Sequence, residues 1–441
     1  MDVSLQDLWV PILTHLVNFG VSVWVVHEKG GLRANLPYSL VLGLYFVFTF
    51  YTPVVNVWAG NLTLYGHAFG AYVESGLLLY SMGVAAFSLG YLLLPAPARR
   101  PLKSRWSAAW VQQKLPMLWG IFAGVIFVNL LILGVLSNRW SLTLLFYAGG
   151  YSPYLEACTD SLITLFTLAL VCRVRLRWLV VAGVLLFGLF MLAGWRYRIV
   201  MLLIIVGGWW LMQARVSPRF WTKAVLGTVL AGIVVMWITL NRAVIVHGWY
   251  EAITFDLTQF DESEIRYQTN NSQAFFSVLE YLDRPDVSFD YGRTMFGFIL
   301  VRPLPAFLFP EGQKPDPPAL TLLHQAFAPT DERVTAALTN LGEWYVAFGL
   351  PGVVLGMMAF GCLLSRFPPP RMARASTSDV APMPEQRPAA PVLHQTLYLL
   401  LTAWLFQYVT RGYLPQHVEL AVYLMLPLGA LAWWARREAK R

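Results

Sequence analysis

The chain has 441 residues, of which 57% are hydrophobic and only 13% are charged. Soluble domains carry about 25% charged residues, so this composition excludes an ordinary soluble protein and indicates a helical protein that crosses a membrane many times. The formal net charge is +8, and the three cysteines (Cys158, Cys172 and Cys362) have spacings that favour neither a disulfide framework nor a thiolate metal site.

The first apolar stretch begins near the N-terminus and is not typical of a cleavable signal peptide. Asp2 and Asp7 stand where such a peptide has basic residues, and no small-residue cleavage site follows. Residues 5–26 are long enough to cross a bilayer, which takes about 20 apolar residues. We therefore expect this stretch to be the first membrane span.

Hydropathy predicts about eleven spans along the chain. Their approximate limits are 5–26, 37–58, 71–94, 115–136, 155–172, 178–194, 199–213, 224–241, 344–364, 393–410 and 417–434. The chain then divides into residues 1–241 with eight spans, a long polar insert at 242–341, and residues 342–441 with three spans. The insert is expected to hold short helices, one of which ends near Leu300 because prolines follow at 303 and 305. Residues 195–198 are expected to form a tight hairpin between the sixth and seventh spans, and residues 365–392 a linker between spans.

The distribution of positive charge predicts how the chain crosses the membrane. With the C-terminus inside, the inner segments hold 21 of the 32 Lys and Arg residues, as the positive-inside rule requires. The N-terminus and the insert then lie outside. The insert holds 13 acidic and 7 basic residues, a net charge of about −6, which argues against a basic surface for nucleic acid.

Several basic residues nevertheless lie on the outer side, where the positive-inside rule makes them scarce. The candidates for holding an anion are Arg196, Arg198, Arg242, Arg302, Lys314 and Arg411. Guanidinium groups bind phosphate through two N–H donors, so arginines gathered at one membrane surface suit a lipid-linked pyrophosphate. The alternative is that each side chain simply reaches from the end of a span into water.

Two residues are candidates for a general base. Glu343 opens the ninth span at the outer surface, where its carboxylate either caps the helix N-terminus or accepts a proton in catalysis. His324 is the second candidate because histidine titrates near neutral pH, although a loop histidine is more often only solvated. Glu419 lies inside the eleventh span, and we expect it to pair with Arg411 rather than to act in catalysis.

The sequence shows no pattern typical of a metal site: it has no His-Glu-x-x-His, no Asp-x-Asp and no Cys/His cluster. The segments on the inner side include none with the features of a nucleotide-binding site, so ATP-driven transport is not expected. We therefore predict neither a metal nor another cofactor.

Five short motifs lie within about residues 140–425. They are Gly194-Trp195-Arg196-Tyr197-Arg198, Asn241-Arg242, the stretch RPLPAFLFPEGQKP from Arg302, the run from Gly342-Glu343-Trp344-Tyr345 to Gly352, and Arg411-Gly412. Together they resemble the Wzy-type O-antigen or exopolysaccharide repeat-unit polymerases of the C-type membrane glycosyltransferase group. Such polymerases often have an Arg followed eleven residues later by Gly in outer loops. Arg196 and Gly207 have that spacing, but Gly207 falls inside a predicted span.

The resemblance implies a reaction at the periplasmic face of a bacterial inner membrane, with a periplasmic N-terminus and a cytoplasmic C-terminus. Donor and acceptor would both be glycans on undecaprenyl pyrophosphate, and the arginines would stabilise that pyrophosphate as it leaves, without a metal. A polysaccharide chain-length regulator is a further partner that the resemblance suggests. Aromatic residues of the insert would stack on sugars: Trp249, Tyr250, Phe255, Tyr267, Tyr281 and Tyr291.

Two alternative functions stay open at this point. An O-antigen ligase uses the same donor but transfers the glycan to a lipid A core, and it would share the outer arginines and the large insert. A transporter or flippase of lipid-linked oligosaccharides would place charges in a cavity along many spans. The predicted spans are nearly free of charge, which favours chemistry at one surface over transport.

Overall fold

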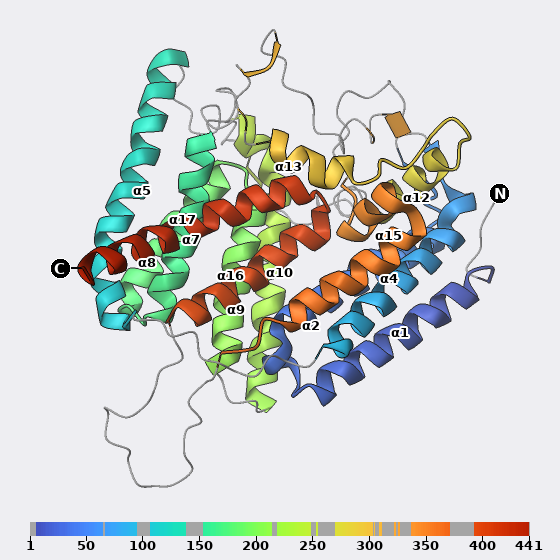
Figure 1. Cartoon of the computed structure of the whole chain (residues 1–441), viewed down its shortest axis with the longest axis horizontal. Coiled ribbons are helices and arrows are strands. Elements are labelled where there is room, and N and C mark those ends of the chain that lie inside the picture. The colour runs from blue at the N-terminus through green and yellow to red at the C-terminus, as the bar shows by residue number, and fades with distance from the viewer. Residues whose placement is uncertain are drawn as a thin grey trace. The chain divides into compact units, whose positions relative to one another are not determined.

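The computed structural model describes residues 6–64, 67–94, 106–137, 153–213, 218–247, 253–254, 270–302, 304, 308–310, 322, 325–326, 337–370 and 392–440. Nearly all elements in these residues are helices (Figure 1). The described residues also include one short antiparallel pair of strands, β1 and β2. The prediction of an all-helical protein is confirmed at this level.

Contacts between residues divide the chain into two compact units. The first unit comprises Met1–Arg99, Glu262–Pro369 and Leu405–Glu419, and the second comprises Arg100–Asp261, Pro370–Trp404 and Leu420–Arg441. The boundaries predicted at residues 241 and 341 concern the path of the chain through the membrane. These contacts do not test that path, so the boundaries stay a prediction.

The first unit is built mainly from the N-terminal helices and from α15. Its elements are α1 (Trp9–Glu28), η1 (Leu32–Asn35), α2 (Leu36–Tyr45), the π-helix η2 (Phe46–Tyr51), α3 (Thr52–Trp58), β1 (Thr63–Leu64), β2 (His67–Ala68), η3 (Gly70–Tyr72), α4 (Val73–Leu93), α12 (Asn271–Leu282), the π-helix η6 (Arg293–Gly297), α13 (Phe298–Val301) and α15 (Asn340–Ser365).

The second unit is built from the middle of the chain. Its elements are α5 (Ala108–Ser137), α7 (Pro153–Val171), α8 (Leu176–Leu192), α9 (Arg196–Gln213) and α10 (Pro218–His247). The last two helices, α16 (Val392–Arg411) and α17 (Leu414–Glu438), contribute residues to both units.

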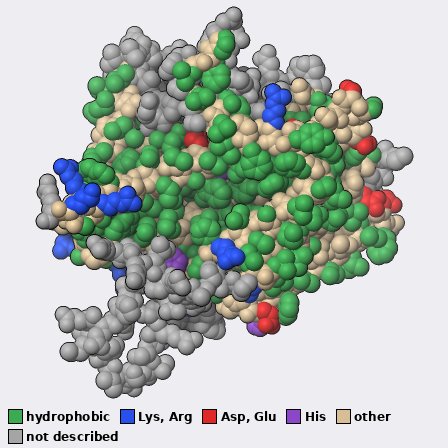
Figure 2. All heavy atoms as spheres, in the orientation of Figure 1, with side chains coloured by type: hydrophobic (Ala, Val, Ile, Leu, Met, Phe, Trp, Pro, Cys, Tyr) green, Lys and Arg blue, Asp and Glu red, His purple; other side chains and the backbone are tan. Residues whose placement is uncertain are grey.

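Seven helices within the described residues are long and apolar enough to cross a membrane. They are Trp9–Glu28, Leu32–Trp58, Gly70–Leu93, Ala108–Ile132, Thr222–Asn241, Asn340–Ser365 and Leu414–Glu438. On the face drawn in Figure 2, hydrophobic side chains cover most of the described helices, as expected of surfaces that contact lipid. These helices indicate a membrane protein.

Each of the seven coincides with a predicted span. The other four predicted spans correspond to α7, α8, α9 and α16, which are helices but are shorter or less apolar than the seven. A total of eleven spans therefore remains a prediction.

Helices α4 and α15 pack closely because both have glycines, which carry no side chain, where the two helices touch. A Cβ at Gly83 of α4 would lie 2.3 Å from Leu341, and one at Gly90 would lie 2.0 Å from the carbonyl oxygen of Met358. On the α15 side, a Cβ at Gly361 would lie 2.1 Å from the carbonyl oxygen of Phe87. Small residues let membrane helices approach in this way, so α4 holds α15 in a fixed register.

Polar side chains add hydrogen bonds between helices of the first unit. Asn18 on α1 donates to the hydroxyl of Ser81 on α4 at 2.7 Å. One turn further, the hydroxyls of Ser22 and Ser88 lie 2.6 Å apart, and Tyr38 donates to Ser88 at 2.8 Å. These pairs stabilise helix association where water cannot compete.

Proline breaks the hydrogen-bond ladder of α17 in the second unit, and α7 compensates for the loss. Pro427 has no N–H to give to the carbonyl of Tyr423, four residues earlier. The hydroxyl of Ser161 donates to that carbonyl at 2.9 Å, and Thr164 donates to the next one, of Leu424, at 2.7 Å. The polar residues of α7 therefore pair with α17.

The predicted polar insert at 242–341 is partly buried in the first unit. In α12, every residue from Asn271 to Leu279 is buried, and Phe275 stacks on Tyr80 of α4 with ring centres 4.6 Å apart. The polar insert therefore contains a helix, α12, whose aromatic residues complete the core of the first unit. The position of the insert on the outer side of the membrane stays a prediction. A short helix predicted to end near residue 300 corresponds to α13.

Candidate functional site

The turn between α16 and α17 is the centre of a polar cluster in the first unit. Gly412 in this turn has a φ of +55°, a conformation that side chains rarely adopt. A Cβ there would also lie 2.3 Å from the carbonyl group of Thr339 and 2.5 Å from the backbone nitrogen of Asn340. Glycine is therefore required, and the turn lies directly against the N-terminus of α15.

Glu343 ties this turn to the first turn of α15. The hydroxyl of Thr339 caps the helix by accepting the N–H of Gly342 at 3.3 Å. The carboxylate of Glu343, which is 3% exposed, accepts the N–H of Leu414 at 2.8 Å. Leu414 is the first residue of α17, so the carboxylate lies at the positive ends of two helix dipoles. This geometry favours the capping role predicted for Glu343 over the role of general base.

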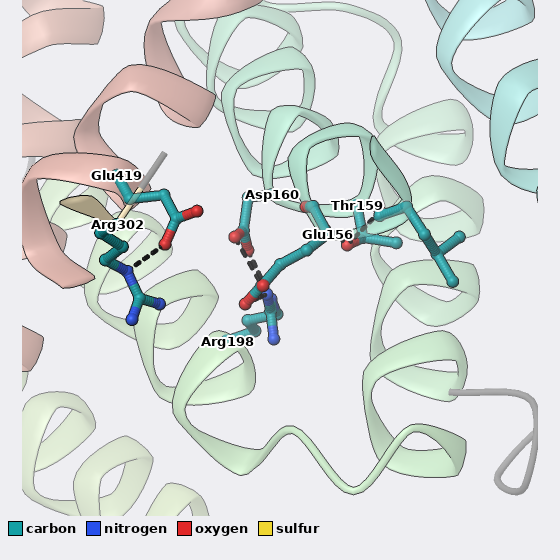
Figure 3. Close-up of polar contacts among 7 residues, drawn as sticks. Glu156, Thr159, Asp160, Arg198, Arg302 and Glu419 are labelled. Atoms are coloured by element: carbon teal, nitrogen blue, oxygen red, sulfur yellow. Dashed lines mark hydrogen bonds and ion pairs between the residues drawn. The ribbon is translucent and has the colours of Figure 1, made fainter. Parts of the chain in front are cut away.

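Arg302 lies on the other side of the turn and pairs with α17. Its Nε donates to Oε2 of Glu419 (Figure 3). Its guanidinium carbon lies 5.7 Å from the ring centre of Tyr413. The two charged side chains are 22% and 21% exposed, so the pair is accessible from outside. Glu419 thus pairs with Arg302, and the predicted pairing of Glu419 with Arg411 stays a prediction.

Burial raises the pKa of the Tyr413 phenol, which stays protonated at neutral pH. The arginine above it therefore faces a neutral ring, and the ring can hold the guanidinium by a cation–π contact without changing the local charge.

Arg411 ends α16 at the same turn and is exposed. His417 lies within electrostatic range of both Arg411 and Arg302, which places the two arginines in one neighbourhood. The imidazole of His417 is fully buried and meets the ring of Tyr408 edge-on at 5.8 Å. Two of the predicted anion-binding residues therefore lie around one turn.

Hydrogen bonds beneath the turn hold it in place. Asn271 of α12 donates to the carbonyl of Thr410 at 2.5 Å, and Tyr45 of α2 donates to the side-chain oxygen of Asn340 at 3.0 Å. All four residues are buried. Arg411 thus projects from a turn that α12 and the N-terminus of α15 hold in place, and Arg302 reaches the same turn from the end of α13.

A second cluster lies in the second unit and surrounds Arg198. Its guanidinium is fully buried and donates through Nε and one Nη to both carboxylate oxygens of Asp160, the latter at 2.9 Å. The same Nη lies 3.1 Å from Glu156 (Figure 3). The ring centres of Trp195 and Tyr197 lie 3.7 and 4.6 Å from the guanidinium carbon. Arg198 was predicted to hold pyrophosphate at an outer surface. The structure places it between two carboxylates and two aromatic rings, away from solvent.

The other predicted residues are only partly described. Arg196 begins α9 and is half-buried, directly after a turn at Gly194 whose φ of +68° makes the predicted hairpin. Arg242 belongs to α10, but its side chain lies outside the described set. Lys314 and His324 also lie outside the described residues. Arg196 and Arg198 belong to the second unit, and the convergence of all these residues at one site stays a prediction.

Of the six aromatic residues predicted to stack on sugars, two lie within the described residues. Tyr291 is 76% exposed and adopts a φ of +53°, whereas the hydroxyl of Tyr281 bonds to Gln325 at 3.2 Å. The remaining four, from Trp249 to Tyr267, lie outside the described residues. Tyr291 is thus the described aromatic residue best placed to meet a ligand.

Sequence reasoning missed the carboxylates of α7. Glu156 and Asp160 are four residues apart, so they lie on one face of a helix, and both fall in the predicted span 155–172. Charges inside a span are usually paired or functional, and that rule was sufficient to single them out. Among the described residues, no group of three His, Cys, Asp or Glu side chains could hold a metal ion.

Comparisons with protein families, with curated proteins and with solved structures found no match for this chain. The resemblance to repeat-unit polymerases therefore rests on the short motifs of the sequence.

Proposed function

We propose that this chain is a membrane glycosyltransferase that polymerises oligosaccharide repeat units carried on polyprenyl pyrophosphate. The observation that supports the proposal best is the α16–α17 turn, where Arg302 and Arg411 share one neighbourhood in a unit whose main helices are apolar enough to cross a membrane. Two partly exposed guanidinium groups beside lipid-facing helices suit an anionic head group on a lipid chain.

In the proposed reaction, a hydroxyl of the acceptor glycan attacks the anomeric carbon of the donor glycan, and polyprenyl pyrophosphate leaves. Negative charge grows on the leaving phosphate, and the fixed guanidinium groups of Arg302 and Arg411 stabilise it. The acceptor proton passes to solvent or to the leaving phosphate. No metal is needed for these steps in the proposal.

Glu343 acts as a positioning residue in this scheme. Its buried carboxylate holds the N–H of Leu414 and therefore fixes the turn from which Arg411 and Tyr413 project. The reaction takes place at the periplasmic face of a bacterial inner membrane, with the N-terminus periplasmic and the C-terminus cytoplasmic. The partners are the lipid-linked glycan, the bilayer and a chain-length regulator.

The buried cluster of Arg198 gives weight to one alternative, the transport of lipid-linked oligosaccharides. Transporters carry paired charges within their helices, and Arg198 with Asp160 and Glu156 is such a group. An O-antigen ligase is the other alternative, because it would use the same anionic donor.

Deletion of the gene, followed by complementation, separates the three functions. Loss of the polymerase leaves single repeat units on the lipid carrier and on the core, and long polymer disappears from gels. Loss of a ligase leaves long polymer on its lipid carrier, and loss of a transporter traps repeat units on the cytoplasmic side. Normal polymer on the core in the deletion strain would overturn all three.

Complementation with Arg302→Gln or Arg411→Gln tests the turn itself. We expect both variants to reach the membrane and to lose long polymer, by about 100-fold or more if each arginine stabilises the leaving group. Arg284→Gln is the matched control, since Arg284 is an exposed arginine that contacts Tyr281 and lies outside the predicted set. Full polymerisation by both turn variants would show that the arginines do not hold the leaving group.

A further inference from the structure

The ion pair between Arg302 and Glu419 has features of a contact that can open. Each side chain keeps about a fifth of its surface exposed, at 22% and 21%. Partly exposed pairs contribute little to stability, because water solvates both charges well once they separate. The cost of parting the two side chains is therefore small.

Tyr413 keeps the guanidinium in place independently of Glu419. The ring lies 5.7 Å from the guanidinium carbon of Arg302, and the turn that carries Tyr413 is fixed by Glu343 and Gly412. A cation–π contact leaves the edge of the guanidinium to other partners. Arg302 can thus exchange one anionic partner for another without moving far.

The charges around the turn favour such an exchange. Arg302 and Arg411 are both positive, and the N-terminus of α17 adds a partial positive charge. Glu343 is buried and bonded to Leu414, whereas Glu419 pairs with Arg302 directly, so an incoming anion competes with Glu419 for this guanidinium.

We propose that Glu419 is an exchangeable counter-ion. Its carboxylate pairs with Arg302 in the free protein, and the diphosphate group of a lipid-linked ligand displaces it when the ligand binds. This proposal rests on the proposed function for the identity of the ligand. A diphosphate carries more charge than a carboxylate and offers more acceptor oxygens, so it displaces Glu419 when it binds. After glycosyl transfer, Glu419 returns to Arg302 and speeds the release of polyprenyl pyrophosphate.

Binding of inorganic pyrophosphate to the purified full-length protein, measured by calorimetry in detergent without divalent metals, tests the exchange. Glu419→Gln removes the competing charge, and we expect pyrophosphate to bind about fivefold more tightly, the effect of one partly exposed charge pair. Arg302→Gln is expected to bind more weakly than the wild type. Adding Glu419→Gln to Arg302→Gln should bring a smaller gain than Glu419→Gln brings to the wild type, because Glu419 then no longer competes at Arg302.

Two controls protect the result against other causes. Glu74→Gln removes an exposed carboxylate elsewhere in the first unit and should leave the affinity unchanged. Exchanging the two residues, by Arg302→Glu with Glu419→Arg, keeps an ion pair and hence the fold, and it should weaken binding as Arg302→Gln does. Unchanged or weaker binding by folded Glu419→Gln would overturn the proposal, as would full binding by the exchanged pair.

Farnesyl pyrophosphate in the same assay identifies the source of the diphosphate. Tighter binding of farnesyl pyrophosphate than of inorganic pyrophosphate supports a lipid-linked ligand, and equal affinities would overturn that part. In a turnover assay, Glu419→Gln should lower KM and kcat together, because product release slows. If the affinities change as expected but the deletion strain makes normal polymer, the exchange stands and the proposed function fails.

Discussion

The two arginine clusters in Figure 3 differ in how deeply the guanidinium and its carboxylate partners are buried. Arg198 is fully buried, binds both oxygens of Asp160 and also contacts Glu156, with side-chain exposures of 0%, 2% and 22%. Arg302 pairs with Glu419, and both side chains remain about a fifth exposed. The sequence assigned Arg198 and Arg302 the same role, and burial separates them.

The difference follows from the cost of taking charges out of water. A buried guanidinium needs partners to offset the loss of hydration, so Asp160 and Glu156 cannot leave Arg198 without a large penalty. A partly exposed guanidinium keeps some water and can change partners. The Arg198 cluster therefore serves to hold α7 and α9 together, whereas the Arg302 cluster is the one to which the proposed ligand binding is assigned.

The largest expected effect comes from breaking the Arg198 cluster. Asp160→Asn removes the negative charge that balances the buried guanidinium of Arg198. We therefore expect the free energy of unfolding to fall by about 3–5 kcal/mol. Unfolding in mixed micelles, followed by circular dichroism, measures the loss. The control is Asp160→Leu combined with Arg198→Met, which removes both charges and should recover most of the stability.

Equal stability of the wild type and Asp160→Asn would contradict the structural role of this cluster. Arg198 would then be open to the anion-binding role that the sequence predicted, and the contrast between the two arginines would fail.

A smaller effect is expected at the turn that supports the Arg302 cluster. Gly412→Ala puts a Cβ 2.3 Å from the backbone of Thr339 in a left-handed conformation, which costs about 1–2 kcal/mol for the conformation alone. We expect a lower unfolding temperature and weaker pyrophosphate binding, since the turn must move. Gly20→Ala is the matched control, because a Cβ there meets nothing within 4 Å and the helix gains from alanine. A turn variant as stable as the wild type would mean that the turn is not held rigidly against α15.

Much of the fold followed from hydropathy. Seven predicted spans coincide with helices long and apolar enough to cross a membrane. A run of about twenty apolar residues is the length of a transmembrane helix, so hydropathy alone is enough to find it. The hairpin at Gly194 and the end of α13 near residue 300 were also predicted from glycine, proline and charge. The burial of α12 was not predicted, because the high average polarity of the insert concealed the aromatic residues Phe275 and Phe276 within it.

The candidate site was predicted less completely, since sequence gives the type of a side chain but not its partner. Arg198 ends a short predicted outer segment and Arg302 lies within the long one, and only tertiary packing brings Asp160 to one and Glu419 to the other. Glu343 was recognised as a helix cap or a base, and the bond to Leu414 that favours the cap joins residues 71 positions apart.

The smallest effect on stability tests the comparison most directly. Glu419→Gln removes one charge from a partly exposed pair, so we expect it to change the unfolding free energy by less than about 1 kcal/mol, and by less still at high salt. Asp160→Asn under the same conditions should lose several times more and respond weakly to salt, because buried charges are poorly screened. If the two variants lost equal stability, the Arg302 pair would be as structural as the Arg198 pair. An anion could then displace Glu419 only at a cost that its binding would have to overcome, which would remove the basis for exchange at Arg302.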